Sequence, residues 1–318
     1  MRAYYFCTYF DSNYLSYGLS LIRSLEKNCE ISFTIYVLCL DEKTYITLKN
    51  FNISSVKLIQ LSQIEYWDSS LLKAKKNRSL IEYYFTLSPI LPLYVLETFK
   101  VDIIASLDAD IMFFSSPSKI FEELDLKSIY IIEHRFRPSF QDHDISGRFN
   151  VQCQLFRNNK IGIDCLNRWR KQCIKWCYDR NEVGKFADQK YLDEWPKIYG
   201  EELVISKNLG VGLAAWNVDG EEIIRSKDGF LINGEPIVFF HFHGLKIYNH
   251  FIAKTGFSAY KTPVTKALRD LYISYISNLF INDFVKKKKK IRQDNYGFIR
   301  TLLSGVKHRD LIFKLNKF

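Results

Sequence analysis

Two aspartates separated by a single residue, Asp108 and Asp110, carry the clearest chemical signal in this sequence. They follow an apolar run at residues 101–107 and precede another apolar stretch that starts at Ile111. Carboxylates at the end of a buried strand are costly unless a cation or hydrogen bonds compensate their charge. Oxygen ligands of this kind suit Mn²⁺ or Mg²⁺. The pair predicts a divalent-metal site, and a surface turn or a helix cap is the alternative interpretation.

A pair of histidines offers nitrogen ligands for the same ion. His241 and His243 lie in the segment FFHFHGLK, and on an extended chain their side chains point to the same side. Imidazole binds Mn²⁺, and the neighbouring Lys246 can meet a phosphate. Taken alone, the pattern fits two ordinary histidines at a strand end better than a ligand pair.

Other motifs have both a chemical and a plain structural interpretation. In TYFDSNY, residues 8–14, a tyrosine can stack on a base and Asp11 can accept hydrogen bonds from its edge, or the segment is a capped turn. Trp216 and Asn217 can form a platform for a sugar or lie in the core. The acidic side chains of residues 186–196 can reach a substrate or form the solvated face of a helix. Cys173 and Cys177 are interpreted as buried helix thiols rather than as a metal pair.

The order of the expected elements predicts an α/β fold with a parallel sheet. Apolar strands at residues 3–9, 32–40 and 56–61 alternate with a helix at 14–28 and a helix that starts from its expected N-cap, Asp41. This order places helices on both faces of a parallel sheet, and ligands bind beyond the carboxyl ends of such strands. Further along, the sequence predicts a helix at 79–99 broken near Pro89 and Pro92, strands at 101–107, 129–133, 151–156 and 236–242, a helix at 161–178, and a short helix at 187–195 ended by Pro196.

The positive charge of the chain is concentrated at its C-terminal end. The 318 residues include 45 basic and 35 acidic side chains, a net charge of +10, and residues 261–318 alone hold 14 basic and 4 acidic ones. We therefore expect a boundary near residue 260, followed by a helical, basic extension. The lysine run at 286–290 suits an anionic membrane surface, reached through residues 286–318, and a solvated tail is the alternative. Nucleic acid is not an expected partner, because the charge lacks a folded binding face.

The expected compartment is the cytoplasm. The N-terminus lacks a secretory cleavage pattern, and an odd number of cysteines, seven, suits a reducing environment. No apolar run reaches the length of a membrane-spanning helix. Binding of the basic tail to lipid would place the protein peripherally on the inner face of the cytoplasmic membrane.

Seven motifs follow one another over residues 1–260, namely TYFDSNY, NRSLIEYYFTLSP, LDADIMFF, FNVQCQLFRN, FADQKYLDEWP, NLGVGLAAWNV and FFHFHGLK. In this order they resemble GT-A fold nucleotide-sugar glycosyltransferases, and are similar to glycosyltransferase family 8 and related bacterial enzymes that build lipopolysaccharide or capsule glycans. The resemblance implies a GT-A catalytic domain over 1–260, with a mixed, mostly parallel central sheet and flanking helices. It further implies metal-dependent, retaining transfer of a sugar from a nucleotide-sugar, a UDP-sugar, to a glycan or lipid-linked acceptor in cell-surface polysaccharide synthesis.

The resemblance also assigns roles to individual residues. Asp108 and Asp110 would hold Mn²⁺ (or Mg²⁺), with His241 as the third protein ligand. Asp188 and Gln189 would face the transferred sugar. The residues assigned to the nucleotide and its phosphates are Thr8, Asp11, Tyr14, Arg78, Asp108 and Lys246, and those assigned to the sugar or acceptor cleft are Asn150, Gln152, Trp216 and Asn217.

Two departures from the family pattern leave alternatives open. The pattern His-x-x-Gly-x-x-Lys places its lysine one residue later than Lys246, so His243 is an alternative metal ligand. A glycine is usual where this chain has Gln152, which bears on the identity of the sugar and on activity itself. An inverting enzyme would need a carboxylate base, for which the candidates are Asp142, Asp144 and Asp188.

Two other functions compete with sugar transfer. A nucleotidyltransferase that makes nucleotide-sugars is the alternative enzyme, although residues 8–14 contain no glycine to form its usual phosphate loop. A catalytically silent glycan- or membrane-binding protein of the same fold is the third interpretation.

Overall fold

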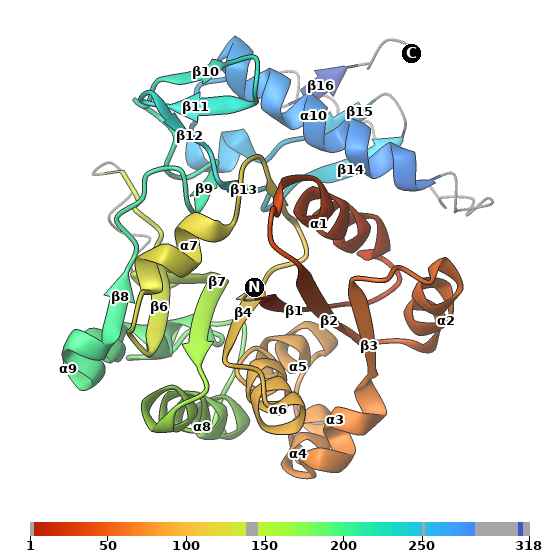
Figure 1. Ribbon diagram of the computed structural model, residues 1–318, viewed down its shortest axis with the longest axis vertical. Helices are drawn as coiled ribbons and strands as arrows, with labels where there is room; N and C mark the ends of the chain where they lie inside the picture. The colour runs from red at the N-terminus through yellow and green to blue at the C-terminus, as the bar shows by residue number, and fades with distance from the viewer. Residues whose placement is uncertain (1–2, 138–145, 250–251, 284–310, 314–318) are drawn as a thin grey trace.

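A mixed sheet of seven strands forms the centre of the computed structural model, which describes residues 3–137, 146–249, 252–283 and 311–313 (Figure 1). The strand order is β3-β2-β1-β4-β7-β6-β8. The strands β3, β2, β1 and β4 run parallel, β7 is antiparallel to both β4 and β6, and β8 is parallel to β6. The predicted α/β fold with a mixed, mostly parallel sheet is therefore confirmed. The strands are β1 (Tyr4–Phe10), β2 (Phe33–Cys39), β3 (Val56–Gln60), β4 (Ile103–Leu107), β6 (Ile129–Glu133), β7 (Phe149–Arg157) and β8 (Leu203–Ile205).

Helices cover both faces of this sheet. On β1, Phe6 packs into a core with α1, α2 and α7, whereas the next residue, Cys7, packs into the opposite core with α5, α6 and α8. This alternation is the period of two that an extended strand imposes on its side chains. The helices are α1 (Leu15–Asn28), α2 (Glu42–Phe51), α3 (Leu61–Trp67), α4 (Ser70–Lys76), α5 (Leu80–Thr86), α6 (Ile90–Phe99), α7 (Ser118–Leu124) and α8 (Lys160–Lys175).

Local sequence signals explain several helix boundaries. The carboxylate of Asp41 accepts a hydrogen bond of 2.7 Å from the backbone N–H of Thr44, which confirms Asp41 as the N-cap of α2. The break predicted near Pro89 is the junction of α5 and α6. Pro92 instead lies in the first turn of α6, where a missing N–H breaks no intrahelical hydrogen bond.

The short helix predicted at 187–195 differs from the structure. Residues Gln189–Glu194 form a 3-10 helix, and α9 (Trp195–Tyr199) follows at once. Pro196 does not end a helix, as predicted, but occupies the first turn of α9. The reason is the same tolerance of proline at a helix start.

A smaller sheet in the order β5-β13-β9 carries part of the site. It contains β5 (Ile111–Phe113), β13 (Phe239–His241) and β9 (Leu213–Ala214). In the antiparallel pair of β13 and β5, His241 lies opposite Ile111. The register therefore brings His241 next to Asp110, although 130 residues separate them in the sequence.

The C-terminal helix α10 (Lys266–Asp283) packs into a third core with α1, β13 and the hairpin of β10 (Ile223–Arg225) and β11 (Phe230–Ile232). Residues on both sides of position 260 pack in this core, and a division into two domains at that position stays a prediction. The lysine run at 286–290 lies outside the described residues. The remaining elements are the strands β12 (Glu235–Pro236), β14 (Lys246–Asn249), β15 (Ile252–Lys254) and β16 (Leu311–Phe313) and the 3-10 turns Gly200–Glu202 and Phe257–Tyr260.

Within the described part of the chain, no helix combines the length and apolar character needed to cross a bilayer.

Candidate active site

The loop between β4 and β5 presents both aspartates at the carboxyl end of β4. The backbone N–H of Asp108 donates to the carbonyl of Gln152 on β7 over 2.9 Å. The carbonyl of Asp110 accepts a hydrogen bond of 3.0 Å from the N–H of Phe242, just beyond β13. The backbone of this loop is therefore held from two sides, by the central sheet and by the smaller one.

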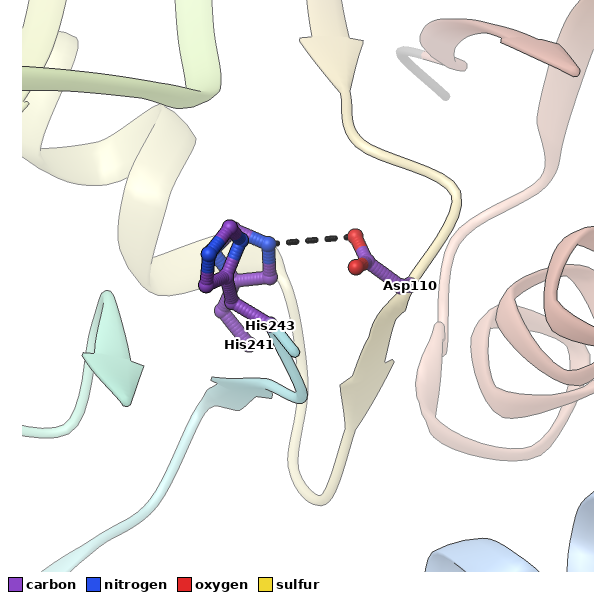
Figure 2. A group of neighbouring side chains, drawn as sticks. All are labelled: Asp110, His241 and His243. Carbon is purple, nitrogen blue, oxygen red and sulfur yellow. Dashed lines mark ion pairs between the residues drawn. The ribbon is translucent and has the colours of Figure 1, made fainter. Parts of the chain in front are cut away.

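The imidazole of His241 lies against both carboxylates. Its Nε2 is 3.1 Å from Oδ1 of Asp110 and 3.7 Å from Oδ2 of Asp108. Asp110, His241 and His243 each offer one ligand atom, and these atoms lie within 4.8 Å of one another. Figure 2 shows both imidazole rings on the same side of Asp110, with the shorter His241 contact dashed. The predicted same-side arrangement of the two histidines is confirmed.

The charges of the site are strongly coupled. Burial, and to a lesser extent the charge of Asp110, raises the pKa of Asp108 to about 7. Burial also acts against ionisation of Asp110, but the charge and hydrogen bond of His241 outweigh it and lower the pKa of Asp110. Burial opposes protonation of His241 as well, yet the two aspartates raise its pKa. His243 differs, because burial and the neighbouring His241 lower its pKa.

These residues fit a divalent cation. Two carboxylates and two imidazoles supply the oxygen and nitrogen ligands that Mn²⁺ accepts. The Nδ1 atom of His241 is buried and has no hydrogen-bond partner in the described structure, so the polar contacts of this ring are those of its Nε2 atom with the two aspartates. A cation would also relieve the repulsion between Asp108 and Asp110.

Asp188 lies near this group, in a buried chain of hydroxyls. Ser88 donates to Oδ2 of Asp188 over 2.5 Å, and Tyr9 lies 2.9 Å from the Ser88 hydroxyl. Because the Ser88 proton points to Asp188, Tyr9 is the donor in the second bond. Burial raises the pKa of Asp188 to about 6. The side chain of Gln189 takes another direction and donates to the carbonyl of Ser146 over 2.8 Å.

The first loop, expected to hold the nucleotide, follows β1 at the same edge of the sheet. The carboxylate of Asp11 accepts from the backbone N–H groups of Asn13 and Tyr14, so it shapes the turn. Tyr14 is half exposed, and burial together with the charges of Asp110 and Asp108 raises its pKa. Thr8 is buried, and its hydroxyl has no partner in the described structure.

A histidine that the sequence did not single out, His134, organises the buried polar network around Asn150. Asn150 donates to Nε2 of His134 over 2.9 Å, so Nδ1 carries the proton and faces the carbonyl of Arg148 at 3.3 Å. Burial lowers the pKa of His134 to about 3, which keeps the ring neutral. The amide oxygen of Asn150 accepts from the N–H of Gln152, whose side chain is fully buried and donates to the carbonyl of Gly212. The sequence signal that could have identified His134 is its position as a polar residue directly after the buried strand β6.

Trp216 and Asn217 are buried and hold this region together. Both donate to the backbone carbonyl of His134, over 3.0 and 2.9 Å. The indole of Trp216 packs edge to face against His241 and His243, with ring centres 5.4 and 5.7 Å apart. The structure thus places Trp216 behind both histidines, a position that orients them.

The two remaining predicted cations lie apart from each other. Arg78 donates to the backbone carbonyls of Cys173 and Ile174 at the end of α8 and to the hydroxyl of Thr86. Lys246 begins β14 and is exposed. Contacts of either residue with a nucleotide stay predictions.

Comparison with known proteins places the chain in a family. No protein-family model matches it. YfnD of Bacillus subtilis (strain 168), itself described as uncharacterized, is 30% identical over 286 residues, which cover 88% of this chain and 89% of YfnD. The chain belongs to the YfnD family.

Solved glycosyltransferases share the fold of this YfnD-family chain at low sequence identity. The galactosyltransferase LgtC, in complex with donor and acceptor sugar analogues, covers 76% of this chain and 87% of its own, with 14% identity and a TM-score of 0.52. Mouse xyloside xylosyltransferase 1 covers 76% of this chain and 98% of its own, with 12% identity and a TM-score of 0.50. The fold is therefore GT-A, and the predicted resemblance is confirmed at that level. Membership of glycosyltransferase family 8 stays a prediction.

Proposed function

We propose that this protein is a metal-dependent glycosyltransferase that uses a nucleotide-sugar, specifically a UDP-sugar. The observation that carries the proposal is the convergence of Asp108, Asp110 and His241 at the carboxyl end of β4, in a GT-A fold. Ligand sites of open α/β sheets lie at such strand ends. The place of the group in the fold and its ligand chemistry point to the same function.

Mn²⁺ (or Mg²⁺) would be held by Asp108 and Asp110, together with His241 or His243. When bound, the cation supplies positive charge for the diphosphate that leaves the sugar. The chain would add Lys246 as a second positive contact to the phosphates. Tyr14, which lies near both aspartates, would hold the uracil ring, and Asp11 would keep that loop in shape.

The sugar itself would lie between Asp188 and the residues around His134. A carboxylate at Asp188 would stabilise positive charge that develops on the sugar. Ser88 bonds this carboxylate and is itself bonded by Tyr9, so the chain of hydroxyls keeps Asp188 in place. The side chain of Gln189 is hydrogen-bonded to the carbonyl of Ser146. Gln189 would therefore meet the sugar with its backbone, or with its side chain after this bond breaks and the side chain rotates. Gln152 is packed against Gly212, so its bulk would restrict which sugar fits.

Retention of configuration is part of the proposal. Asp188 is buried and hydrogen-bonded to Ser88, which is in turn bonded to Tyr9 at the end of β1. This position suits contact with the donor sugar rather than with an acceptor. Of the other carboxylates considered as an inverting base, Asp142 and Asp144 lie outside the described residues. The anomeric configuration of the product, read by NMR, tests this part directly.

The acceptor would be a glycan or a lipid-linked glycan in cell-surface polysaccharide synthesis. The basic residues between 286 and 318 support peripheral binding at the cytoplasmic face of an anionic membrane, where a lipid-linked acceptor is available.

Release of UDP from a panel of UDP-sugars, with and without Mn²⁺, tests the function. Metal-dependent release of UDP supports sugar transfer or its hydrolytic side reaction. Release of pyrophosphate from UTP and a sugar 1-phosphate, in a parallel assay, would point instead to a nucleotidyltransferase, and binding of the UDP-sugars without turnover to a silent glycan-binding protein. Either result would overturn the proposal.

A further inference from the structure

A polar cavity lies apart from the aspartates. Its volume is about 580 Å³, and its walls come from α1, β5, the β10–β11 hairpin and α10. In Figure 1, α10 runs from this hairpin to α1 across one end of the molecule. We refer to this space as the basic cavity.

Positive charge dominates two walls of the basic cavity. Arg23 and Lys27 project from α1, and Arg225 and Lys227 come from the β10–β11 hairpin. None of these four cations forms an ion pair within the described part of the chain, and the lining contains one carboxylate, Asp228. Four exposed cations around one cavity, with a single carboxylate among them, create a positive potential there, so an anion in the cavity would be stabilised.

The third wall offers neutral hydrogen-bond donors. Ser274 and Ser277 of α10 are half-buried and line the cavity, and their hydroxyls form no hydrogen bond with any described residue. Helical serines usually donate to their own backbone when nothing else is offered. Two such hydroxyls, together with the four cations, form a donor-rich site for an oxyanion.

An apolar floor completes the cavity. Phe114 and Phe230 pack edge to face there, with ring centres 5.4 Å apart, and Met112 lies beside them. A bare inorganic ion needs no such surface. Cations, hydroxyls and an apolar floor together suit an oxyanion that is attached to carbon.

The basic cavity is distinct from the candidate active site. Asp110 precedes β5, whereas Phe113 and Phe114, at the far end of that strand, line the cavity. Three strand residues span roughly 10 Å. Part of one short strand thus separates the basic cavity from the aspartates.

We propose that the basic cavity binds the phosphate group of a phosphorylated ligand, carried by a soluble phosphomonoester or by a lipid headgroup. The arginines and lysines of α1 and of the hairpin can donate to the several oxygens of a phosphate, and the serines of α10 add neutral donors. The proposal does not depend on transferase activity, because it concerns residues outside the candidate active site.

Binding to the full chain in the presence of EDTA tests the proposal. The probes are glycerol 3-phosphate, followed by calorimetry, and phosphatidylcholine vesicles with or without phosphatidic acid, followed by sedimentation. Arg23→Gln/Arg225→Gln removes one cation from each wall, and we expect affinity to fall by about tenfold or more. The control Lys43→Gln/Arg269→Gln removes the same charge from exposed positions outside the cavity and should change affinity less than about twofold.

Loss of glycerol 3-phosphate binding in the cavity variant, but not in the control variant, supports a soluble ligand. Loss confined to the phosphatidic acid vesicles supports a lipid headgroup. Equal loss in the cavity and control variants overturns the proposal, as does a wild-type chain that binds neither probe. Ser277→Ala keeps every charge, and its weaker binding would distinguish a specific site from general attraction to positive charge.

Discussion

Replacing Asp110 by asparagine removes one charge from the centre of the candidate active site while preserving the shape of the side chain. We expect Mn²⁺-dependent UDP release to fall by about 100-fold or more, because the neutral amide no longer offsets a divalent cation. The melting temperature should fall without loss of the fold, since His241 loses the carboxylate with which it pairs. The same assay on His241→Asn and on His243→Asn identifies which of the two histidines binds the metal ion. Full activity in Asp110→Asn would exclude the metal site.

Asp188→Asn, a second change at the scale of one residue, tests the cost of a buried carboxylate. Burial raises the pKa of Asp188 from 3.8 to about 6, so its contribution to folding is fully present below pH 3.8 and is lost as the pH rises through 6. The variant should therefore become more stable relative to wild type between pH 4 and pH 7, by up to about 3 kcal/mol. Urea unfolding in EDTA at several pH values measures this difference. A constant difference across this range would contradict the assignment.

At the scale of elements, α10 supports the histidine strand. The ring of Tyr275 stacks on Phe242, the residue between the two histidines, with ring centres 3.7 Å apart. Tyr275→Ala should lower the free energy of unfolding by about 3–5 kcal/mol. It should also weaken Mn²⁺ binding, because the support of the histidine strand is lost.

The matched control for this change is Tyr275→Phe. It keeps the stacked ring and removes a buried hydroxyl that has no partner in the described structure, so stability should hold or increase by about 1 kcal/mol. Denaturant unfolding and Mn²⁺ titration measure both variants. Unaltered Mn²⁺ affinity in a folded Tyr275→Ala protein would show that α10 does not position the histidines.

For the molecule as a whole, the lysine run at 286–290 tests membrane attachment. Substituting its five lysines with glutamine should strongly reduce binding to anionic liposomes, since each nearby lysine contributes about 1 kcal/mol. Substitution is preferable to deleting 286–318, because β16 within that segment pairs with β15. UDP release from soluble donors should be unchanged. Undiminished liposome binding would contradict a membrane role for the run.

Much of the fold could be predicted because its signals are local. The apolar runs that become β1, β2 and β3, and the cap of α2 at Asp41, depend on residues close together in the sequence. The position of Asp108 and Asp110 at the end of β4 follows from the same pattern. Pro196 was misread because one residue type can either end or begin a helix, and only its neighbours in space decide which.

By itself, the sequence determined the type of chemistry, which is an aspartate pair and a histidine pair at strand ends. Tertiary structure alone decided which groups meet. His241 reaches Asp110 through the register of β13 on β5, and His134 enters the site through Asn150. The basic cavity joins α1 to a hairpin and to α10, both of which follow α1 by some 200 residues or more along the chain. Such contacts depend on how whole elements pack, and no periodicity within a single segment encodes that packing.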